Sequence, residues 1–160
     1  MDLDFIDKLI KGKITEIIFD QMFRTSGRFD IIPFGYETTL PQLAQYQNNL
    51  VVKDVLNNIK HSPDFVLVAH DKKAAFLVEV KYCHGHSEEN VLNFAKDVLE
   101  NHYDPSWVFV ADTDGFYFEP SHDIENNLGK IKKLESINKW GISGETLEKY
   151  RVLLNKYINH

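Results

Sequence analysis

The feature that most constrains the fold is a pair of apolar runs separated by a short polar turn. Residues 64–82 contain two stretches rich in Val, Leu and Phe on either side of the sequence His-Asp-Lys-Lys. Such a pattern predicts a β-hairpin. A turn centred on Asp71 and Lys72 would place residues that are equidistant from it opposite each other. The turn therefore decides the register, and a shift by one residue would move every side chain to the other face.

In that register Asp64 lies opposite Glu79, with Cα atoms roughly 4.5–5.5 Å apart. Lys81 shares their face, because side chains alternate along a strand. Like charges opposed across strands are destabilising, and burial raises the cost. Protonation of one acid, an ion pair with Lys81 or a bound divalent cation would each relieve the repulsion. A simpler alternative is a solvated pair of strand ends with an ordinary Glu–Lys ion pair.

The cation hypothesis gives these three side chains a chemical purpose. Two carboxylates form a hard oxygen site that suits Mg²⁺ or Mn²⁺. Such a cation makes water a better nucleophile, and Lys81 would hold that water or stabilise charge on a phosphate. Asp64, Glu79 and Lys81 are thus the parts needed for metal-assisted phosphodiester hydrolysis.

The rest of the sequence predicts a single α/β domain over residues 1–160, with no internal repeat or linker. Steps of three and four between apolar residues predict the first helix, and a Ser-Gly pair after it is a plausible stop. A proline in the first strand predicts an edge or bulged strand. The expected elements are helix 3–24, strand 28–36, helix 52–59, the hairpin, helix 87–101 with Ser87 as its cap, strands 107–111 and 116–118, and helices 123–139 and 143–158.

Pro63-Asp64, followed by Glu79-Val80-Lys81, resembles the PD-(D/E)XK motif of the restriction-endonuclease-like nuclease superfamily. Upstream, residues 11–16 resemble the glutamate-bearing helix of that family, and residues 34–37 fall in its first core strand. The resemblance covers about residues 5–112. It implies an α-β-β-β-α-β core with a mixed central sheet flanked by helices. Residues 113–160 would add a strand and C-terminal helices.

Carried over residue by residue, the resemblance makes Asp64 and Glu79 the metal ligands and Lys81 the catalytic lysine. Glu16 would reach the site from the first helix, as a further ligand or through a water. Its position on that helix leaves a solvated Glu16 as an equal alternative. The implied cofactor is Mg²⁺ or Mn²⁺.

The sequence departs from the family pattern in the helix after Lys81. Many relatives that process DNA ends carry a Gln and a Tyr there, whereas this helix has no such glutamine. Asn93 and Lys96 are the polar positions that could face a groove. No helicase motif, zinc finger or separate DNA-reading module accompanies the domain.

Composition limits the classes of partner and compartment. The net charge is −6, which argues against a broad polyanion binder without excluding a local basic groove. Cys83 is the single cysteine, so no intramolecular disulfide can form and a reducing compartment is plausible. We expect a cytoplasmic protein without a membrane partner, because the sequence has no signal peptide and no apolar stretch of the roughly 18 residues that span a bilayer.

Three other motifs have ordinary structural interpretations. Residues 83–86 contain a cysteine and two histidines, but too few ligands for zinc, and a solvated loop is the better interpretation. Residues 112–115 resemble the start of a calcium loop but predict a tight turn. The lysines of residues 130–139 could grip a phosphate backbone beside Trp140, although a charged helix surface is the commoner outcome.

The resulting hypothesis is a divalent-metal-dependent nuclease that hydrolyses phosphodiester bonds in DNA, with RNA as an open alternative. A homodimer is a reasonable expectation, because relatives that cut both strands often pair. The alternative, from a different class, is a catalytically inactive nuclease-fold protein that serves as a nucleic-acid or protein binding module.

Overall fold

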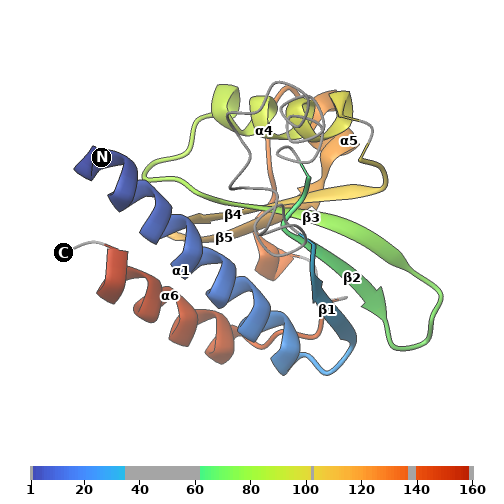
Figure 1. The fold of residues 1–160 in the computed structure, drawn as a ribbon. Coiled ribbons are helices and arrows are strands. Elements are labelled where there is room, and N and C mark those ends of the chain that lie inside the picture. The colour runs from blue at the N-terminus through green and yellow to red at the C-terminus, as the bar shows by residue number, and fades with distance from the viewer. Residues whose placement is uncertain (1, 35–61, 102, 137–139, 159–160) are drawn as a thin grey trace, which may run out of the picture.

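The computed structural model describes residues 2–34, 62–101, 103–136 and 140–158 (Figure 1). Within these described residues five strands form one open sheet in the order β1-β2-β3-β4-β5, in which only β3 and β4 run parallel. The chain is therefore an α/β protein with a mixed sheet flanked by helices, as predicted. The elements are α1 (Leu3–Thr25), β1 (Phe29–Pro33), β2 (Phe65–Ala69), β3 (Ala75–Tyr82), α4 (Glu88–Glu100), β4 (Ser106–Asp112), β5 (Gly115–Pro120), α5 (Ser121–Asn126), the 3-10 turn η2 (Leu134–Ser136) and α6 (Gly144–Ile158).

The central hairpin has the predicted register. Strands β2 and β3 pair antiparallel, with Phe65 opposite Val78 and Val68 opposite Ala75. Lys72 adopts a positive φ of 61° in the turn between them. Of the two predicted alternatives, the structure has the edge strand, because among the described residues β1 pairs with β2 alone and lies at one end of the sheet.

Helices cover both faces of the sheet (Figure 1). Helices α1 and α6 pack on one face, where Phe19 and Phe23 are fully buried among aromatic side chains of the strands. Helices α4 and α5 pack on the other face, around Val91 and Ile124. Strand β4 is buried on both of its faces, as its unbroken apolar sequence predicts. Each of these large apolar side chains contributes roughly 1.5–3 kcal/mol by leaving water.

The two predicted helix boundaries that flank the hairpin are confirmed. Gly27 follows α1 with a positive φ of 66° and so ends that helix after Ser26. Ser87 caps α4, since its side chain accepts a hydrogen bond of 3.1 Å from the backbone N–H of Asn90.

The predicted helix over 123–139 is wrong. Helix α5 ends at Asn126, and Leu128 and Gly129 then take positive φ values of 57° and 93°. The chain continues beside β5, where the backbone N–H of Phe118 donates to the carbonyl oxygen of Lys132 at 3.0 Å. The expected helix over 52–59 lies outside the described residues.

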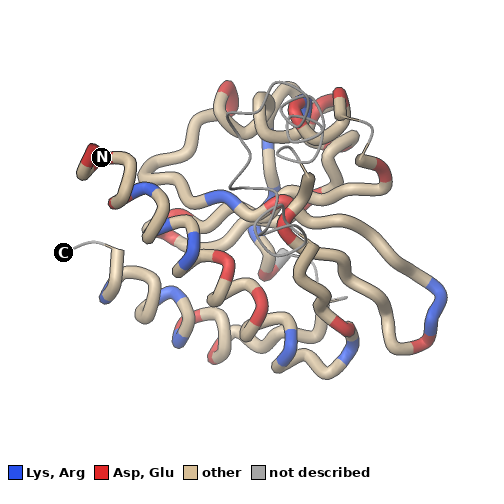
Figure 2. The backbone as a smooth tube through the Cα atoms, viewed as in Figure 1, with Lys and Arg blue, Asp and Glu red and all other residues tan. Residues whose placement is uncertain are grey.

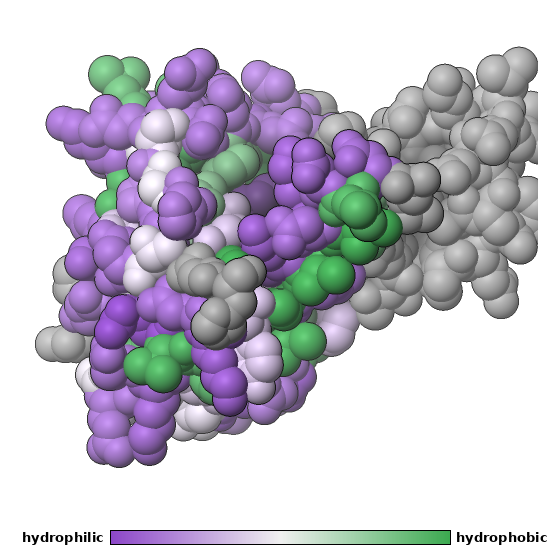
Figure 3. All heavy atoms as spheres, turned by 90° about the vertical axis from the view of Figure 1, so that its left-hand side faces the viewer, coloured by the Kyte–Doolittle hydropathy of each residue, from purple (hydrophilic) through white to green (hydrophobic). Residues whose placement is uncertain are grey.

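Polar and apolar side chains mix on the surface. Figure 3 shows green apolar side chains in separate groups among purple hydrophilic ones on the side where α1 begins. Phe5 and Ile10 on α1 are 58% and 52% exposed. No helix among the described residues is both long and apolar enough to cross a bilayer.

Candidate active site

The site lies where β2 separates from β3. The ladder between β2 and β3 ends at Phe65 opposite Val78, whereas the ladder between β3 and β4 continues to Tyr82 opposite Ala111. From Glu79 onward, β3 therefore has β4 on one side and no β2 partner among the described residues, and this point is the fork of the sheet.

Asp64 lies at this fork, immediately before β2. Its backbone N–H donates to the carbonyl oxygen of Val78 at 3.0 Å. Its carboxylate Oδ2 accepts a hydrogen bond of 2.8 Å from the backbone N–H of Val80. The side chain thus takes over a backbone donor that a continued β2 would have satisfied, and this fixes the carboxylate against β3.

Glu79 and Lys81 lie on the face of β3 that is turned toward α4. Nζ of Lys81 is 2.8 Å from Oε1 of Glu79. The Glu79 side chain is 14% exposed and that of Lys81 is 39% exposed. An ion pair at this depth is screened less than a surface pair.

Glu16 approaches from α1, on the opposite side of the sheet. Its negative charge acts on both Asp64 and Glu79. Its Oε2 atom is 3.0 Å from Nζ of Lys13, one turn earlier on the same helix. The Glu16 side chain is 25% exposed, and its charge belongs to the electrostatic surroundings of the fork. Asp64, Glu79 and Lys81 thus lie together at the fork, whereas Glu16 contributes its charge from α1, and no three acids converge among the described residues.

Burial is the largest cause of the pKa shifts of the side chains at the fork. Burial raises the pKa of Asp64 well above its ordinary value, and the charges of Glu79 and Glu16 raise it further. Burial also raises the pKa of Glu79, although Lys81 opposes that shift. For Lys81 burial lowers the pKa, but the charges of Glu79 and Asp64 outweigh it, so that the pKa is raised overall. The lysine therefore carries a proton at neutral pH, and the acids repel each other.

Helix α4 adds two residues that the sequence analysis missed. Nζ of Lys81 lies over the Phe94 ring, 5.6 Å from its centroid. The charge of Asp97 raises the pKa of both Glu79 and Lys81. Asn93 and Lys96, the positions considered from sequence, are exposed, as is Asp97. Phe94 follows buried Val91 by three positions, so helical periodicity could have indicated it.

The two carboxylates at the fork are the type of ligand that a hard divalent cation prefers. Mg²⁺ commonly binds through one or two carboxylates and keeps several waters, and Asp64 and Glu79 supply two adjacent, mutually repelling carboxylates. In the part of the chain that the structure describes, no three His, Cys, Asp or Glu side chains converge as a ready-made metal site. Because Glu79 is engaged with Lys81, binding of a cation would require that pair to rearrange.

A second cluster lies at the ends of β3 and β4. His86 Nδ1 is 2.7 Å from Oδ2 of Asp112, whose carboxylate also accepts backbone N–H groups from Gly85, His86 and Thr113. The interpretation of residues 83–86 as a solvated loop is therefore wrong for His86. The tight turn predicted over 112–115 is confirmed, with Asp112 opposite Gly115.

The proposed phosphate grip beside Trp140 is not supported. Trp140 is 3% exposed and packs against Phe118 with ring centroids 4.8 Å apart, so its ring cannot stack on a base. Lys132 and Lys133 lie in an extended segment beside β5 rather than on a helix. Lys139 lies outside the described residues.

Comparisons with known proteins give no relative: no family model, curated protein or solved structure matches this chain.

Proposed function

We propose that this chain is a divalent-metal-dependent nuclease of the PD-(D/E)XK type that hydrolyses phosphodiester bonds in DNA. The observation that carries the proposal is the pair of repelling carboxylates, Asp64 and Glu79, with Lys81 in the same fork of the sheet. The described elements follow the order α1-β1-β2-β3-α4-β4, which agrees with the α-β-β-β-α-β core expected of that superfamily and supports a restriction-endonuclease-like topology.

Each residue has a defined task in this proposal. Asp64, kept in place by the amide of Val80, and Glu79 would hold Mg²⁺ or Mn²⁺, with Glu16 as a further ligand or a contact through water. The bound cation would supply Lewis acidity and an activated water. Lys81, protonated and held over Phe94, donates hydrogen bonds to the oxygens on which negative charge develops.

The experiment is a cleavage assay on plasmid, linear, branched and single-stranded DNA, and on RNA, with Mg²⁺ or Mn²⁺ and with EDTA. We expect cleavage that EDTA abolishes. Glu79→Gln and Lys81→Ala each reduce the rate about a hundredfold or more, because they remove a ligand or a stabilising charge. Cleavage that survived both substitutions would refute the proposal.

The matched controls come from an ion pair of the same kind. Lys149 Nζ lies 3.0 Å from Oε1 of Glu145 on the surface of α6. Glu145→Gln and Lys149→Ala change the same charges by the same amounts. Both control variants are expected to cleave at the wild-type rate.

A second candidate function is a binding module on the same fold that no longer cuts. It is favoured by the engagement of Glu79 with Lys81 and by the lack of a converged metal site among the described residues. Titration calorimetry with Mn²⁺ separates the two candidates. A protein that takes up no Mn²⁺, even beside an oligonucleotide, would be a binding module.

A further inference from the structure

An aromatic ring lies beside the ion pair of the candidate active site. Nζ of Lys81 is 2.8 Å from Oε1 of Glu79 and, at the same time, 5.6 Å from the centroid of the Phe94 ring. The face of an aromatic ring carries negative charge density and attracts a cation. The lysine ammonium therefore has two neighbours, a carboxylate on its own strand and a ring on α4.

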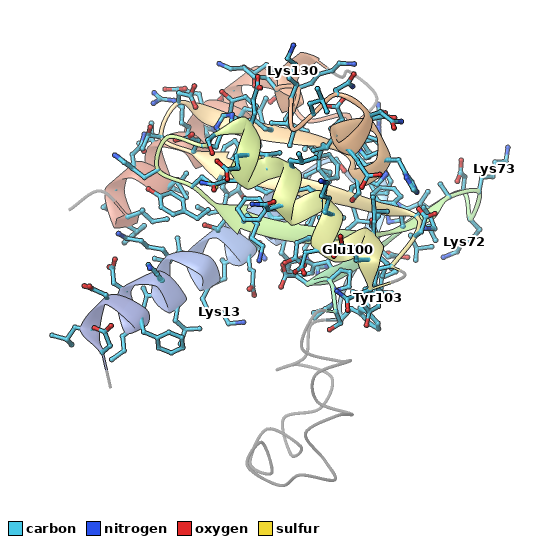
Figure 4. All side chains as sticks on the ribbon, turned by 90° about the horizontal axis from the view of Figure 1, so that it is seen from above. Lys13, Lys72, Lys73, Glu100, Tyr103 and Lys130 are labelled. Carbon is cyan, nitrogen blue, oxygen red and sulfur yellow. The ribbon has the colours of Figure 1, made fainter. Side chains whose placement is uncertain are left out.

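The packing of α4 fixes the position of this ring. Phe94 is half-buried and packs against a cluster that includes Val91, Ala95 and Val110, all of them fully buried. Figure 4 shows α4 lying across the sheet, with Glu100 at its end. Because the buried side chains of α4 hold the helix in this orientation, the ring keeps its place whether or not Lys81 contacts it.

The carboxylate neighbour of the lysine has a second use in the proposed function. Glu79 would hold a divalent cation there, and two positive charges beside one carboxylate repel each other. Lys81 must therefore give up its pair with Glu79 when the cation binds. Its proposed task at the phosphate nevertheless requires the ammonium to stay at the fork.

The ring is suited to hold the released ammonium. Within the ion pair the Glu79 carboxylate offsets part of the charge that the ring meets, whereas a released lysine presents its full charge, so the ring attracts it more strongly. Other neighbours compete for the lysine. Its side chain is 39% exposed to water, and the charge of Asp97 on α4 acts on it and raises its pKa. Figure 2 shows acidic segments on both α1 and α4.

We propose that Phe94 is a positioning residue, which keeps the Lys81 ammonium at the fork when Glu79 turns to a divalent cation. The inference rests on the proposed metal-dependent function. It adds how the lysine and the cation share one carboxylate. A ring that retains the released lysine favours the cation-bound state, so its effect is measurable as cation affinity, without catalysis.

The first test is calorimetric titration of Mn²⁺ into the whole chain with 3,4,5-trifluorophenylalanine in place of Phe94. Fluorination keeps the approximate shape of the ring and removes the negative charge of its face. We expect Mn²⁺ affinity to fall about three- to tenfold, the range of a cation–π contact at a partly exposed site. Phe94→Leu gives a similar loss, and Phe94→Tyr, which retains the ring, keeps wild-type affinity.

A double-mutant cycle connects the loss to the lysine. Lys81→Met removes the charge and is expected to raise Mn²⁺ affinity, because Glu79 then has no ammonium beside it. In that background Phe94→Leu changes Mn²⁺ affinity by less than about twofold. The matched control is the contact of Lys156 Nζ with the exposed Tyr157 ring, 5.3 Å from its centroid on α6. Tyr157→Leu leaves Mn²⁺ affinity unchanged.

The second test locates the lysine itself by NMR. Protons over the face of an aromatic ring are shifted upfield, so the ε-methylene protons of Lys81 report on their position relative to Phe94. The protein is labelled with ¹³C-lysine, and the Lys81 signal is assigned by its loss in Lys81→Arg. We expect an upfield shift that persists in saturating Mg²⁺ and is absent from Phe94→Leu.

The possible failures are distinguishable. Mn²⁺ affinity that is insensitive to fluorination, a loss that persists in Lys81→Met, or a Lys81 signal that loses its shift in Mg²⁺ overturns the role of the ring. A loss of Mn²⁺ affinity in Asp97→Asn but not on fluorination also overturns it, in favour of Asp97. Ring-dependent Mn²⁺ binding without cleavage of any nucleic acid contradicts the nuclease proposal and supports the ring. A chain that takes up no divalent cation overturns both.

Discussion

Nζ of Lys81 lies 2.8 Å from Oε1 of Glu79, while the neighbouring carboxylate of Asp64 is held by the amide of Val80 instead. Lys81 thus faces several acidic side chains and neutralises only part of their negative charge. The excess negative charge destabilises the fold, and in the proposed function a bound cation would offset it. The stability of the metal-free protein therefore reports on the site independently of catalysis.

We predict that Asp64→Asn stabilises the metal-free protein at neutral pH by about 1 kcal/mol, since water at this half-buried site screens part of the repulsion. The amide oxygen still accepts the Val80 N–H, and one charge is removed. Because the folded pKa of Asp64 is raised, the native state holds more protons than the unfolded state above the ordinary value of 3.8. Wild-type stability therefore falls as pH rises from about 4 through the folded pKa.

Urea unfolding of both proteins in EDTA, at several pH values from 4 to 8, checks this prediction. The advantage of Asp64→Asn grows with pH and then levels off. Asp71→Asn is the control, because Asp71 is exposed in the β2–β3 turn and accepts a backbone N–H from Lys73. Destabilisation by Asp64→Asn at pH 7 would contradict the repulsion.

Asp112 is shifted in the opposite direction. Burial alone would raise its pKa, but hydrogen bonds from the backbone N–H groups of His86, Gly85 and Thr113 and from the His86 ring hold it well below the ordinary value. We predict that Asp112→Asn costs about 1–3 kcal/mol at pH 7, because it leaves donors in the 83–87 loop poorly satisfied. The wild-type advantage is present above about pH 4 and is lost as pH falls below that value.

Thermal unfolding of Asp112→Asn between pH 3 and pH 7 measures this effect. An exposed pair of the same type provides the control, since His122 Nε2 lies 3.1 Å from Oδ2 of Asp104, with both side chains more than half exposed. Asp104→Asn is expected to change stability by less than about 0.5 kcal/mol. Equal losses of stability in the two variants would show that the hydrogen bonds around Asp112 add nothing to the free energy of unfolding.

Much of the fold could be predicted because local patterns and tertiary packing agree there. Alternation of apolar residues and the short turn were enough for the register of β2 and β3, although the ladder ends at Phe65 opposite Val78, one residue short of the predicted pairing of Asp64 with Glu79. The candidate site residues could be proposed from the sequence for the same reason, since three of them lie on or beside one hairpin. Glu16 was ambiguous, because nothing local indicates that its charge on α1 acts on acids of the sheet.

The helix predicted over 123–139 does not form because of a tertiary contact. An ideal Cβ on Gly129 would lie 1.9 Å from the carbonyl oxygen of Glu88, so the chain must pass close to the start of α4 at this point. The lysine-rich sequence that follows has helical composition, but the approach to α4 and the pairing with β5 determine its conformation. No local pattern encodes that contact.

We predict that Gly129→Ala destabilises the protein by more than about 2 kcal/mol, because a clash with backbone adds to an unfavourable φ of 93°. Gly85→Ala is the matched control. Gly85 has a φ of 72°, but its Cβ would meet nothing within 4 Å, so that only the backbone strain of about 1 kcal/mol applies. Chemical denaturation of both variants measures the difference, and equal losses would show that the approach to α4 relaxes without cost.

Cys83 provides a chemical probe of the same end of the sheet. Burial and then the charge of Asp112 raise the pKa of its thiol to about 11, from an ordinary value of 9.0. Only the thiolate reacts with iodoacetamide, so we predict that alkylation of the folded protein at pH 8 is about a hundredfold slower than that of the urea-unfolded chain. Asp112→Asn should speed the reaction of the folded protein, because it removes a nearby negative charge. Mass spectrometry over a time course gives both rates, with a single cysteine to follow. A folded-state rate equal to the unfolded rate would mean that Cys83 is neither shielded nor influenced by Asp112.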